Sequence, residues 1–285
     1  MVATLTFGFK PESLLPDQGT VWSFPIAPRR DDLDDLVDLV RLGQERHGHV
    51  VAIYPAWRPE PALRRLETVQ AATDSRRLAV YGTALPPLAG AVLASLTSAV
   101  SAYVPSAGTL VSGLGALERE LITMAWLGGV AGLSSPSPSI LQHVASWWPK
   151  SSFGVFFWPQ PSVKLLTKKE RAAVPVPTTY RPQCVVIGAR EGADRTWVDE
   201  CVLPAFGSPP TKEVEATELG PEWWGTARLT ELVAYPVDVP VTARRISQGL
   251  VNSLCRWCGE PVASDRCPFC GIDLSSAART PEGAV

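Results

Sequence analysis

Four of the six cysteines in this 285-residue chain form two Cys-x-x-Cys pairs near the C-terminus, and their spacing predicts a metal site. Two residues between the cysteines of a pair allow a tight turn that aims both sulfur atoms at one point. Zinc prefers a tetrahedron of soft or borderline ligands, which four thiolates provide. A glycine follows the second cysteine of each pair, where the chain must turn sharply. The predicted ligands are Cys255, Cys258, Cys267 and Cys270.

The segment that carries these cysteines reads C-R-W-C-G-E-P-V-A-S-D-R-C-P-F-C-G and resembles a short zinc ribbon. The resemblance implies that the four cysteines hold a structural Zn²⁺ ion, because four thiolates leave no open position for a catalytic water. Eight residues separate the two pairs, which is short for a ribbon, so we expect a minimal pair of knuckles. Tetrahedral sulfur sites also bind iron, and the spacing alone leaves both metals open.

The charges around the cysteines indicate what this module contacts. Arg256 and Arg266 are balanced by Glu260 and Asp265. A nucleic-acid-binding face requires a clear basic excess, so the charge balance disfavours nucleic acid as a partner. Each pair also encloses an aromatic residue, and such residues more often cover a metal or anchor a protein contact.

Short apolar runs rich in β-branched residues alternate with amphipathic segments through the rest of the chain. Runs of this kind predict buried strands, and the segments between them predict helices. The alternation favours an α/β fold with a mixed, largely parallel sheet and flanking buried helices. The predicted strands are 49–54, 78–81, 153–158 and 184–187, and the predicted helices include 31–42, 59–72 and 86–103.

Two long runs, 78–117 and 121–149, contain no charged residue. A membrane-spanning helix needs about 20 mostly apolar residues, commonly flanked by basic clusters. These runs are instead rich in small residues and interrupted by prolines, so helices buried in protein explain them better. The helix at 86–103 has one face of large residues and one of small residues, which suits burial in a core or at a subunit interface. We therefore expect no membrane association.

Proline content and charge divide the sequence into segments. The stretch 159–182 is rich in proline and holds a basic cluster, Lys164, Lys168, Lys169 and Arg171, as is typical of a solvated linker. We predict an α/β core at 1–158, a linker or loop at 159–182, the remainder of the core or a small second lobe at 183–250, the zinc ribbon at 251–272 and a disordered tail at 273–285.

Recognisable catalytic motifs are missing, which argues against an enzyme. Neither a nucleophile elbow, a metalloprotease helix nor a kinase pattern is found. The glycine-bearing loop at 188–195 follows a predicted strand, where α/β folds often bind ligands, but its spacing matches neither the dinucleotide fingerprint nor the P-loop. His47 and His49 have no third ligand nearby, so a second metal site is not expected.

The composition sets the remaining expectations. A formal net charge of −2 gives no overall attraction to nucleic acid or anionic lipid. The first residues lack the charged and apolar segments of a secretory signal, so we expect a cytoplasmic, reducing compartment in which paired cysteines bind metal. Heavy use of Arg, Ala and Pro favours a bacterial source.

The sequence contains two pairs of adjacent tryptophans, Trp147-Trp148 and Trp223-Trp224, which are candidate contact residues. Exposed tryptophan is a common interface anchor. Together with the neutral metal module, the pairs predict a protein-interaction or assembly component that carries a structural zinc knuckle and binds a protein partner or a second copy of itself. One alternative is an enzyme or nucleotide-binding protein that uses the loop after 184–187. The other is a nucleic-acid-associated zinc-ribbon protein.

Overall fold

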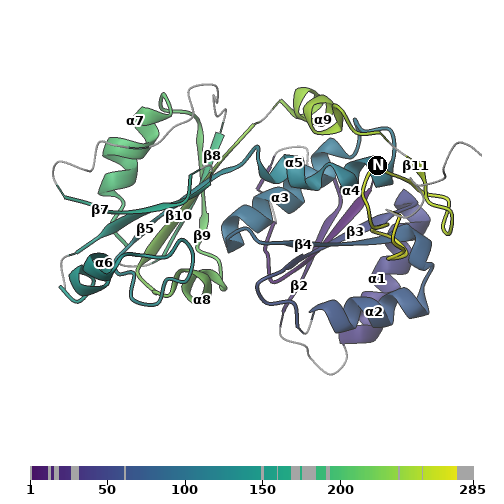
Figure 1. Ribbon diagram of the computed structural model, residues 1–285, viewed down its shortest axis with the longest axis horizontal. Helices are drawn as coiled ribbons and strands as arrows, with labels where there is room; N and C mark the ends of the chain where they lie inside the picture. Colours follow the sequence, from purple (N-terminus) through teal and green to yellow (C-terminus); the bar gives the residue numbers. More distant parts are fainter. Residues whose placement is uncertain are drawn as a thin grey trace, which may run out of the picture.

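Most of the described strands belong to two large sheets, which form two lobes that lie side by side (Figure 1). A short two-stranded sheet near the C-terminus lies against the first lobe. The computed structural model describes residues 2–11, 14–15, 19–26, 32–60, 62–148, 151–158, 160–167, 174, 184–190, 193–236, 238–251 and 253–274.

The first sheet is entirely parallel, with the strand order β2-β1-β3-β4. Its two central strands are buried on both faces, as parallel strands usually are, which explains their continuous apolar runs. Helices α1 and α2 cover one face and α3 covers the other (Figure 1). The elements are β1 (Ala3–Phe7), β2 (Val21–Phe24), α1 (Asp32–His47), β3 (Val50–Pro55), α2 (Ala62–Ala72), the 3₁₀ turn η1 (Ser75–Arg77) and β4 (Leu78–Thr83).

Helix α3 (Pro87–Val100) lies between the two sheets, and all 14 of its residues are buried. It contacts β1 and β3 of the first sheet and β10 of the second. Hydroxyl groups inside the helix are satisfied locally, since Thr97 donates to the carbonyl of Leu93 at 2.7 Å. The predicted buried helix at 86–103 is therefore confirmed over Pro87–Val100, whereas Tyr103 is exposed. The expectation of buried helices in the second uncharged run, 121–149, was wrong, because Ile122–Leu127 forms a strand and none of the residues of the helix Ile140–Ala145 is buried. Among the residues described, none of the helices combines the length and the apolar character that a membrane crossing requires.

The second sheet is mixed, with the order β7-β6-β5-β10-β8-β9. Neighbouring strands are antiparallel except β8 and β9. The predicted α/β class with parallel strands is therefore confirmed, and the antiparallel pairs that make up most of the second sheet are an addition to it. The strands are β5 (Ile122–Leu127), β6 (Phe153–Trp158), β7 (Ser162–Leu165), β8 (Cys184–Ala189), β9 (Thr211–Glu215) and β10 (Leu229–Tyr235).

Short helices cover both faces of the second sheet. One face packs against η2 (Val198–Val202) and α7 (Leu203–Ala205), and the other against α6 (Ile140–Ala145) and α8 (Gly220–Trp224). Segments distant in sequence meet in this sheet. The predicted segment 1–158 supplies strands to both sheets, and Ser162–Leu165 of the predicted linker forms β7. Hydrophobic pattern alone carries no information about which sheet a strand joins.

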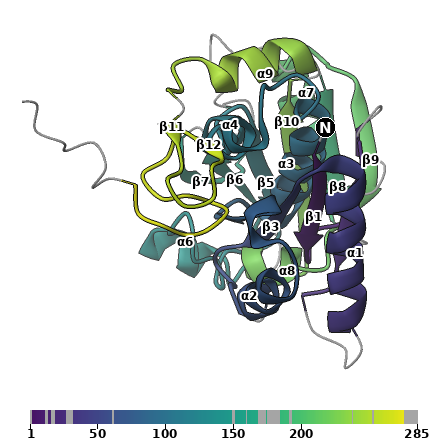
Figure 2. The ribbon, with the colours of Figure 1, turned by 90° about the vertical axis from the view of Figure 1, so that its right-hand side faces the viewer.

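The chain returns to the first lobe after β10. Helix α9 (Val239–Ser247) lies over α3 and α5 (Leu114–Glu118), and leads to β11 (Ser253–Leu254) and β12 (Pro261–Val262). Figure 2 shows this C-terminal module, which we define as residues 253–274, beside α4 (Ala107–Ser112). Residues 275–285, most of the predicted disordered tail, lie outside the described residues.

The module docks where α4 offers no side chain. A methyl group built on Gly108 would lie 1.7 Å from the carbonyl oxygen of Pro261, so only glycine permits this approach. One turn further on, the hydroxyl of Ser112 accepts a 2.9 Å hydrogen bond from the amide of Ala263. At the edge of the first sheet, the amide of Val80 donates to the carbonyl of Pro268 at 3.3 Å. Backbone contacts therefore hold the module in place.

Gly108→Ala is expected to loosen the module. The added methyl group meets backbone that cannot rotate away, so we expect a loss of about 2 kcal/mol of unfolding free energy. Hydrogen exchange should also quicken in residues 253–274. Gly115→Ala on α5 is the matched control, because its new methyl group has no neighbour closer than 3.9 Å. Equal stability and equal exchange in both variants would contradict the docking.

Candidate functional site

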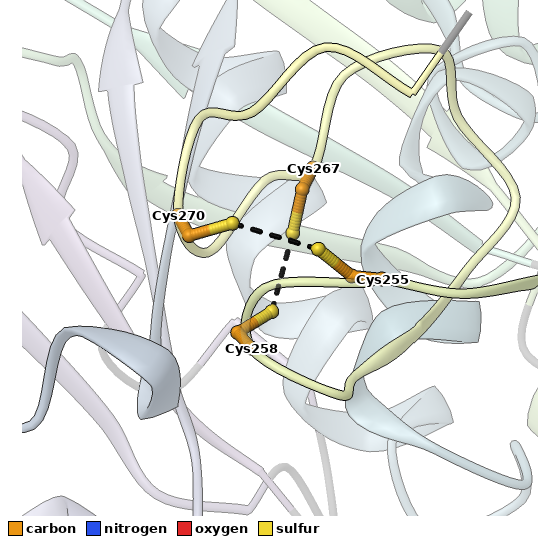
Figure 3. A group of neighbouring side chains, drawn as sticks. All are labelled: Cys255, Cys258, Cys267 and Cys270. Carbon is orange, nitrogen blue, oxygen red and sulfur yellow. Dashed lines mark hydrogen bonds between the residues drawn. The ribbon is translucent and has the colours of Figure 1, made fainter. Parts of the chain in front are cut away.

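The four predicted cysteine ligands converge in the C-terminal module (Figure 3). All four sulfur atoms lie within 4.8 Å of one another. The sulfur atoms of Cys255 and Cys270 are 3.6 Å apart, and those of Cys258 and Cys267 are 3.5 Å apart. These separations are far too long for a disulfide. They are close to the edge of about 3.8 Å that four sulfurs define around a metal at about 2.3 Å.

Two equivalent turns bring the sulfur atoms together. The amide of Gly259 donates to the carbonyl of Cys255 at 2.8 Å, and the amide of Gly271 donates to that of Cys267 at 2.9 Å. Both glycines have positive φ, at 78° and 73°, as the sharp turn requires. Within the described part of the module, β11 and β12 form a single antiparallel pair. The arrangement is the short double knuckle that the eight-residue spacing predicts.

The turns also set the chemistry of the thiols. Burial disfavours the thiolate of Cys255, but hydrogen bonds from the amides of Cys258 and Trp257 outweigh it and lower the pKa of this thiol to about 7. Burial raises the pKa of Cys258 and Cys267. Backbone amides that point at a sulfur stabilise its thiolate, which is the form that binds metal.

One histidine that the sequence analysis considered contacts this module. His49 Nε2 lies 2.9 Å from Glu260 Oε1, and the ring stacks edge-on against Phe269 with 5.7 Å between centroids. The neighbouring His47 contacts the hydroxyl of Thr20 at 3.2 Å instead. Of the two aromatic residues in the module, Phe269 is therefore part of the core, whereas Trp257 is 77% exposed.

Beside these docking contacts, residues of the module, α2, β4 and α4 line a groove of about 890 Å³, which is within the size range of ligand-binding clefts. The apolar side chains of its floor are the half-buried Leu63 and Val80 and the buried Leu66, Val111 and Phe269. Polar side chains lie along it. The described residues that line the groove include Tyr54, Leu63, Leu66, Glu67, Gln70, Val80, Tyr81, Val111, Gly115, Trp257, Arg266 and Phe269.

Two tyrosines in the groove remain hydrogen-bond donors over the physiological pH range. Burial raises the pKa of Tyr54. Burial and the nearby carboxyl of Glu118 raise the pKa of Tyr81. Arg266 is the only Lys or Arg among the described residues that line the groove, and its Nε donates to the carbonyl of Gly271 at 2.9 Å. The groove thus combines an apolar floor with a small number of fixed donors.

A second polar site lies at the junction of the lobes. The carboxyl of Glu231 on β10 is fully buried; it accepts from Thr217 Oγ1 at 2.7 Å, from Trp224 Nε1 at 2.9 Å and from the amide of Leu88 at 3.4 Å. Burial raises the pKa of Glu231. Leu88 belongs to the first turn of α3, so this carboxyl joins the second sheet to the first lobe.

Aromatic side chains fill the same junction beside the carboxyl end of β3. Trp57 and Trp223 meet edge to face with 5.0 Å between ring centroids, and Phe157 packs on Trp223 at 5.7 Å. Arg58 and Glu222 form an ion pair next to them. Both indole nitrogens, of Trp57 and Trp223, are buried without a hydrogen-bond partner in the described structure. The carboxyl end of parallel strands is a common ligand site, but here side chains occupy it.

Glu231→Gln is expected to change how stability depends on pH. Because the folded pKa is raised above 4.5, the protonated carboxyl stabilises the fold below about pH 4.5, and this contribution is lost as the pH rises through the folded pKa. Glutamine keeps the shape and a carbonyl acceptor but has no such proton to lose. Its unfolding free energy should therefore fall less than that of the wild type between about pH 5 and pH 8.

Urea unfolding at several pH values measures this difference. The wild type should lose about 1.4 kcal/mol of unfolding free energy for each unit by which folding raises the pKa of Glu231. Glu45→Gln, at an exposed position on α1, is the control and should follow the wild type. If the unfolding free energy of Glu231→Gln and of the wild type depended on pH in the same way, burial would not raise the pKa of this carboxyl.

The other residues singled out in the sequence do not assemble into a site. Lys164 lies on β7, and Lys168, Lys169 and Arg171 are outside the described residues. In the loop after β8, residues 191–192 are also outside them. Arg195 is engaged by two carboxylates, at 2.5 Å from Glu213 and 3.3 Å from Asp199. Of the tryptophan pairs, Trp147-Trp148 is exposed, whereas Trp224 is fully buried.

Comparison with known proteins identifies the fold. No family model and no curated protein matches the sequence. A DegV family protein from Corynebacterium glutamicum has 13% identity and a TM-score of 0.56, with 82% of this chain and 96% of that chain covered. One from Eubacterium eligens, loaded with heptadecanoic acid, has 9% identity and a TM-score of 0.53 over 83% and 100%. A fatty-acid-binding one from Thermus thermophilus has 12% identity and a TM-score of 0.53 over 83% and 99%.

These matches contradict the function predicted from the sequence. Neither an assembly component built around a zinc knuckle nor the nucleotide-binding and nucleic-acid alternatives agrees with a fold of which several solved examples are described as fatty-acid-binding or as loaded with a fatty acid. The prediction was wrong because the cysteine segment was the one specific motif in the sequence, although it occupies a small part of the chain. That the chain binds a protein partner or a second copy of itself stays a prediction.

Proposed function

We propose that this chain binds a long-chain fatty acid, with the acyl chain lying in the groove between the C-terminal module and the first lobe. The groove of about 890 Å³ with its apolar floor is the observation that carries the proposal. The DegV-like fold supports it, because solved proteins of this fold are described with heptadecanoic acid or other fatty acids bound.

The floor of the groove suits a methylene chain. The half-buried Leu63 and Val80 present apolar surface from α2 and β4, and the buried Leu66, Val111 and Phe269 also line the groove. Each methylene group that leaves water for such a surface contributes about 0.8 kcal/mol before the cost of ordering the chain. Trp257 on the rim is 77% exposed, and a chain in the groove would cover part of its indole.

The rim supplies a partner for the carboxylate. Arg266 keeps guanidinium donors beyond the Nε–H that binds the carbonyl of Gly271. The phenol of Tyr54 adds a neutral donor, whereas the hydroxyl of Tyr81 is hydrogen-bonded to the carboxyl of Glu118. A fatty acid would therefore place its carboxylate toward Arg266 and its chain toward α2 and α4.

The four thiols would hold a structural Zn²⁺ ion that keeps one wall of this groove in place. Their number, their separations of about 3.5 Å and the amides that point at them fit a tetrahedral zinc site. Four sulfur ligands fill the coordination sphere, so the metal would shape the groove and take no part in reaction chemistry. The wall it fixes contains Trp257, Arg266 and Phe269.

Filling the groove tests the lipid proposal. Gly115 faces the groove from α5, and a Cβ atom built there meets nothing closer than 3.9 Å, so we expect the ring of Gly115→Phe to enter the groove. We expect the wild type to co-purify with fatty acid, measured by extraction and mass spectrometry, and Gly115→Phe to retain about tenfold less.

Gly115→Ala is the matched control, because its methyl group leaves the groove open, and it should carry as much fatty acid as the wild type. The proposal fails if the wild type binds no fatty acid, either on purification or on titration with a C16 acid. If Gly115→Phe and Gly115→Ala carried equal amounts of fatty acid, the ligand would have to bind at a site other than the groove.

Removing one thiol tests the metal. Cys258→Ser is expected to lower zinc from about one equivalent to well below half, as measured by elemental analysis, and to loosen residues 253–274. Because the module walls the groove, fatty-acid loading should fall as well. Cys201→Ser, at a half-buried cysteine outside the module, should change neither quantity. Full retention of one equivalent by Cys258→Ser would falsify the four-thiolate site.

A further inference from the structure

The four thiols of the C-terminal module differ in their exposure to solvent. The first cysteines of the two knuckles, Cys255 and Cys267, are only 2% and 1% exposed. The second cysteines, Cys258 and Cys270, are half-buried, and the glycine that follows each of them lies on the surface. Each knuckle therefore has one sulfur that a small molecule can reach and one that the protein covers.

The close contacts between these sulfur atoms run from one knuckle to the other. The sulfur of Cys258 lies 3.5 Å from that of Cys267, and the sulfur of Cys270 lies 3.6 Å from that of Cys255 (Figure 3). Each contact thus joins an accessible sulfur to a covered one. Redox-sensitive thiols commonly have this arrangement, in which an accessible thiol is oxidised first and a neighbouring thiol then forms a disulfide with it.

We infer that the module is a redox switch. A peroxide oxidises it to two disulfides across the knuckles, Cys258–Cys267 and Cys255–Cys270, and this oxidation releases the ligand of the groove. The release of the ligand rests on the function proposed above. The formation of the disulfides rests only on the geometry and the exposure of the four thiols.

Each disulfide forms in two steps. The thiolate of Cys258 attacks one oxygen of hydrogen peroxide, the O–O bond breaks, and a sulfenic acid and hydroxide result. The thiolate of Cys267 then attacks the sulfur of this sulfenic acid, so that an S–S bond forms, the S–O bond breaks and a second hydroxide leaves. The two thiolates together lose two electrons, which reduce the peroxide, and two protons convert both hydroxides to water. Cys270 and Cys255 react in the same way.

Oxidation removes the two supports of the groove wall. The thiolate is the form that binds metal, so conversion to disulfides would release a Zn²⁺ ion held by the four sulfurs. An S–S bond of about 2.05 Å also brings each pair closer by about 1.5 Å. Movement of Cys267 displaces Pro268, whose carbonyl accepts from the amide of Val80 at 3.3 Å. Phe269 follows in the chain and lines the groove, so the wall loosens.

Titration of the full, zinc-loaded chain with hydrogen peroxide tests the switch. We expect about two equivalents of peroxide to release about one equivalent of Zn²⁺, measured with a chromogenic chelator. Peptide mapping by mass spectrometry should find the two disulfides across the knuckles. Fatty-acid loading should fall by about fivefold or more, and dithiothreitol with added Zn²⁺ should restore it.

Cys258→His separates metal binding from oxidation, because three thiolates and one imidazole also make a structural zinc site. This variant should contain Zn²⁺ before oxidation, by elemental analysis, and should form only the Cys255–Cys270 disulfide. Cys201→Ser is the control, because this half-buried cysteine lies outside the module, and it should respond to peroxide as the wild type does.

Three results would overturn the inference. They are full retention of Zn²⁺ by the wild type in excess peroxide, disulfides within a knuckle in place of those across the knuckles, and unchanged fatty-acid loading of the oxidised chain. A wild type that carries no fatty acid in either redox state would instead contradict the proposed function. Zinc release and the disulfide map would still decide whether the thiols respond to peroxide, so the two failures give different results.

Discussion

The convergence of four thiols at the end of the chain is the constraint on which the groove depends. The sheet of the C-terminal module consists of two strands of two residues each. Such a sheet is too small to be stable by itself. Its buried apolar residues, Val262 and Phe269, belong to the core cluster around α3 that the two lobes share. Sulfur atoms held at about 3.5 Å by a metal would fix the loop that carries the rim residues of the groove.

The module is connected to both lobes through its contacts with α4 and through the buried helix α3. Gly108 and Ser112 of α4 receive it through backbone contacts, and α4 follows α3 in the chain. Helix α3 carries no charge and lies between the two sheets, where the carboxyl of Glu231 reaches its first turn. A buried carboxyl costs free energy when ionised, so its three hydrogen bonds favour one arrangement of the lobes. The aromatic contact between Trp57 and Trp223 fills the remaining space.

The sequence was sufficient for features that depend on local spacing. The two Cys-x-x-Cys pairs and the uncharged helix at 87–100 follow from short-range pattern, because a turn or a helix face is encoded within a few residues. Glu231 was not foreseen, since a charge within an alternating strand ordinarily faces water, whereas both faces of β10 are covered. Gly108 gave no signal, because its partner Pro261 lies far along the chain.

The groove and the exposed face of α6 escaped prediction for related reasons. The groove is lined by residues from 54 to 115 and from 257 to 271, which meet only in three dimensions. In α6, the apolar stripe at 140, 141, 144, 147 and 148 has the spacing of a core-facing helix, so sequence pattern alone predicts burial. Only the hydrogen bonds of Gln142 and Ser146 show which side faces the protein.

A crystal structure of the zinc-loaded protein with a saturated C16 fatty acid would test the central claim most directly. The account predicts an acyl chain in the groove, in contact with Leu66, Val111 and Phe269, with its carboxylate beside Arg266 and one metal ion between the four sulfur atoms. Density for the chain between the lobes, with Trp57 and Trp223 displaced, would contradict it. So would an empty groove at saturating fatty acid.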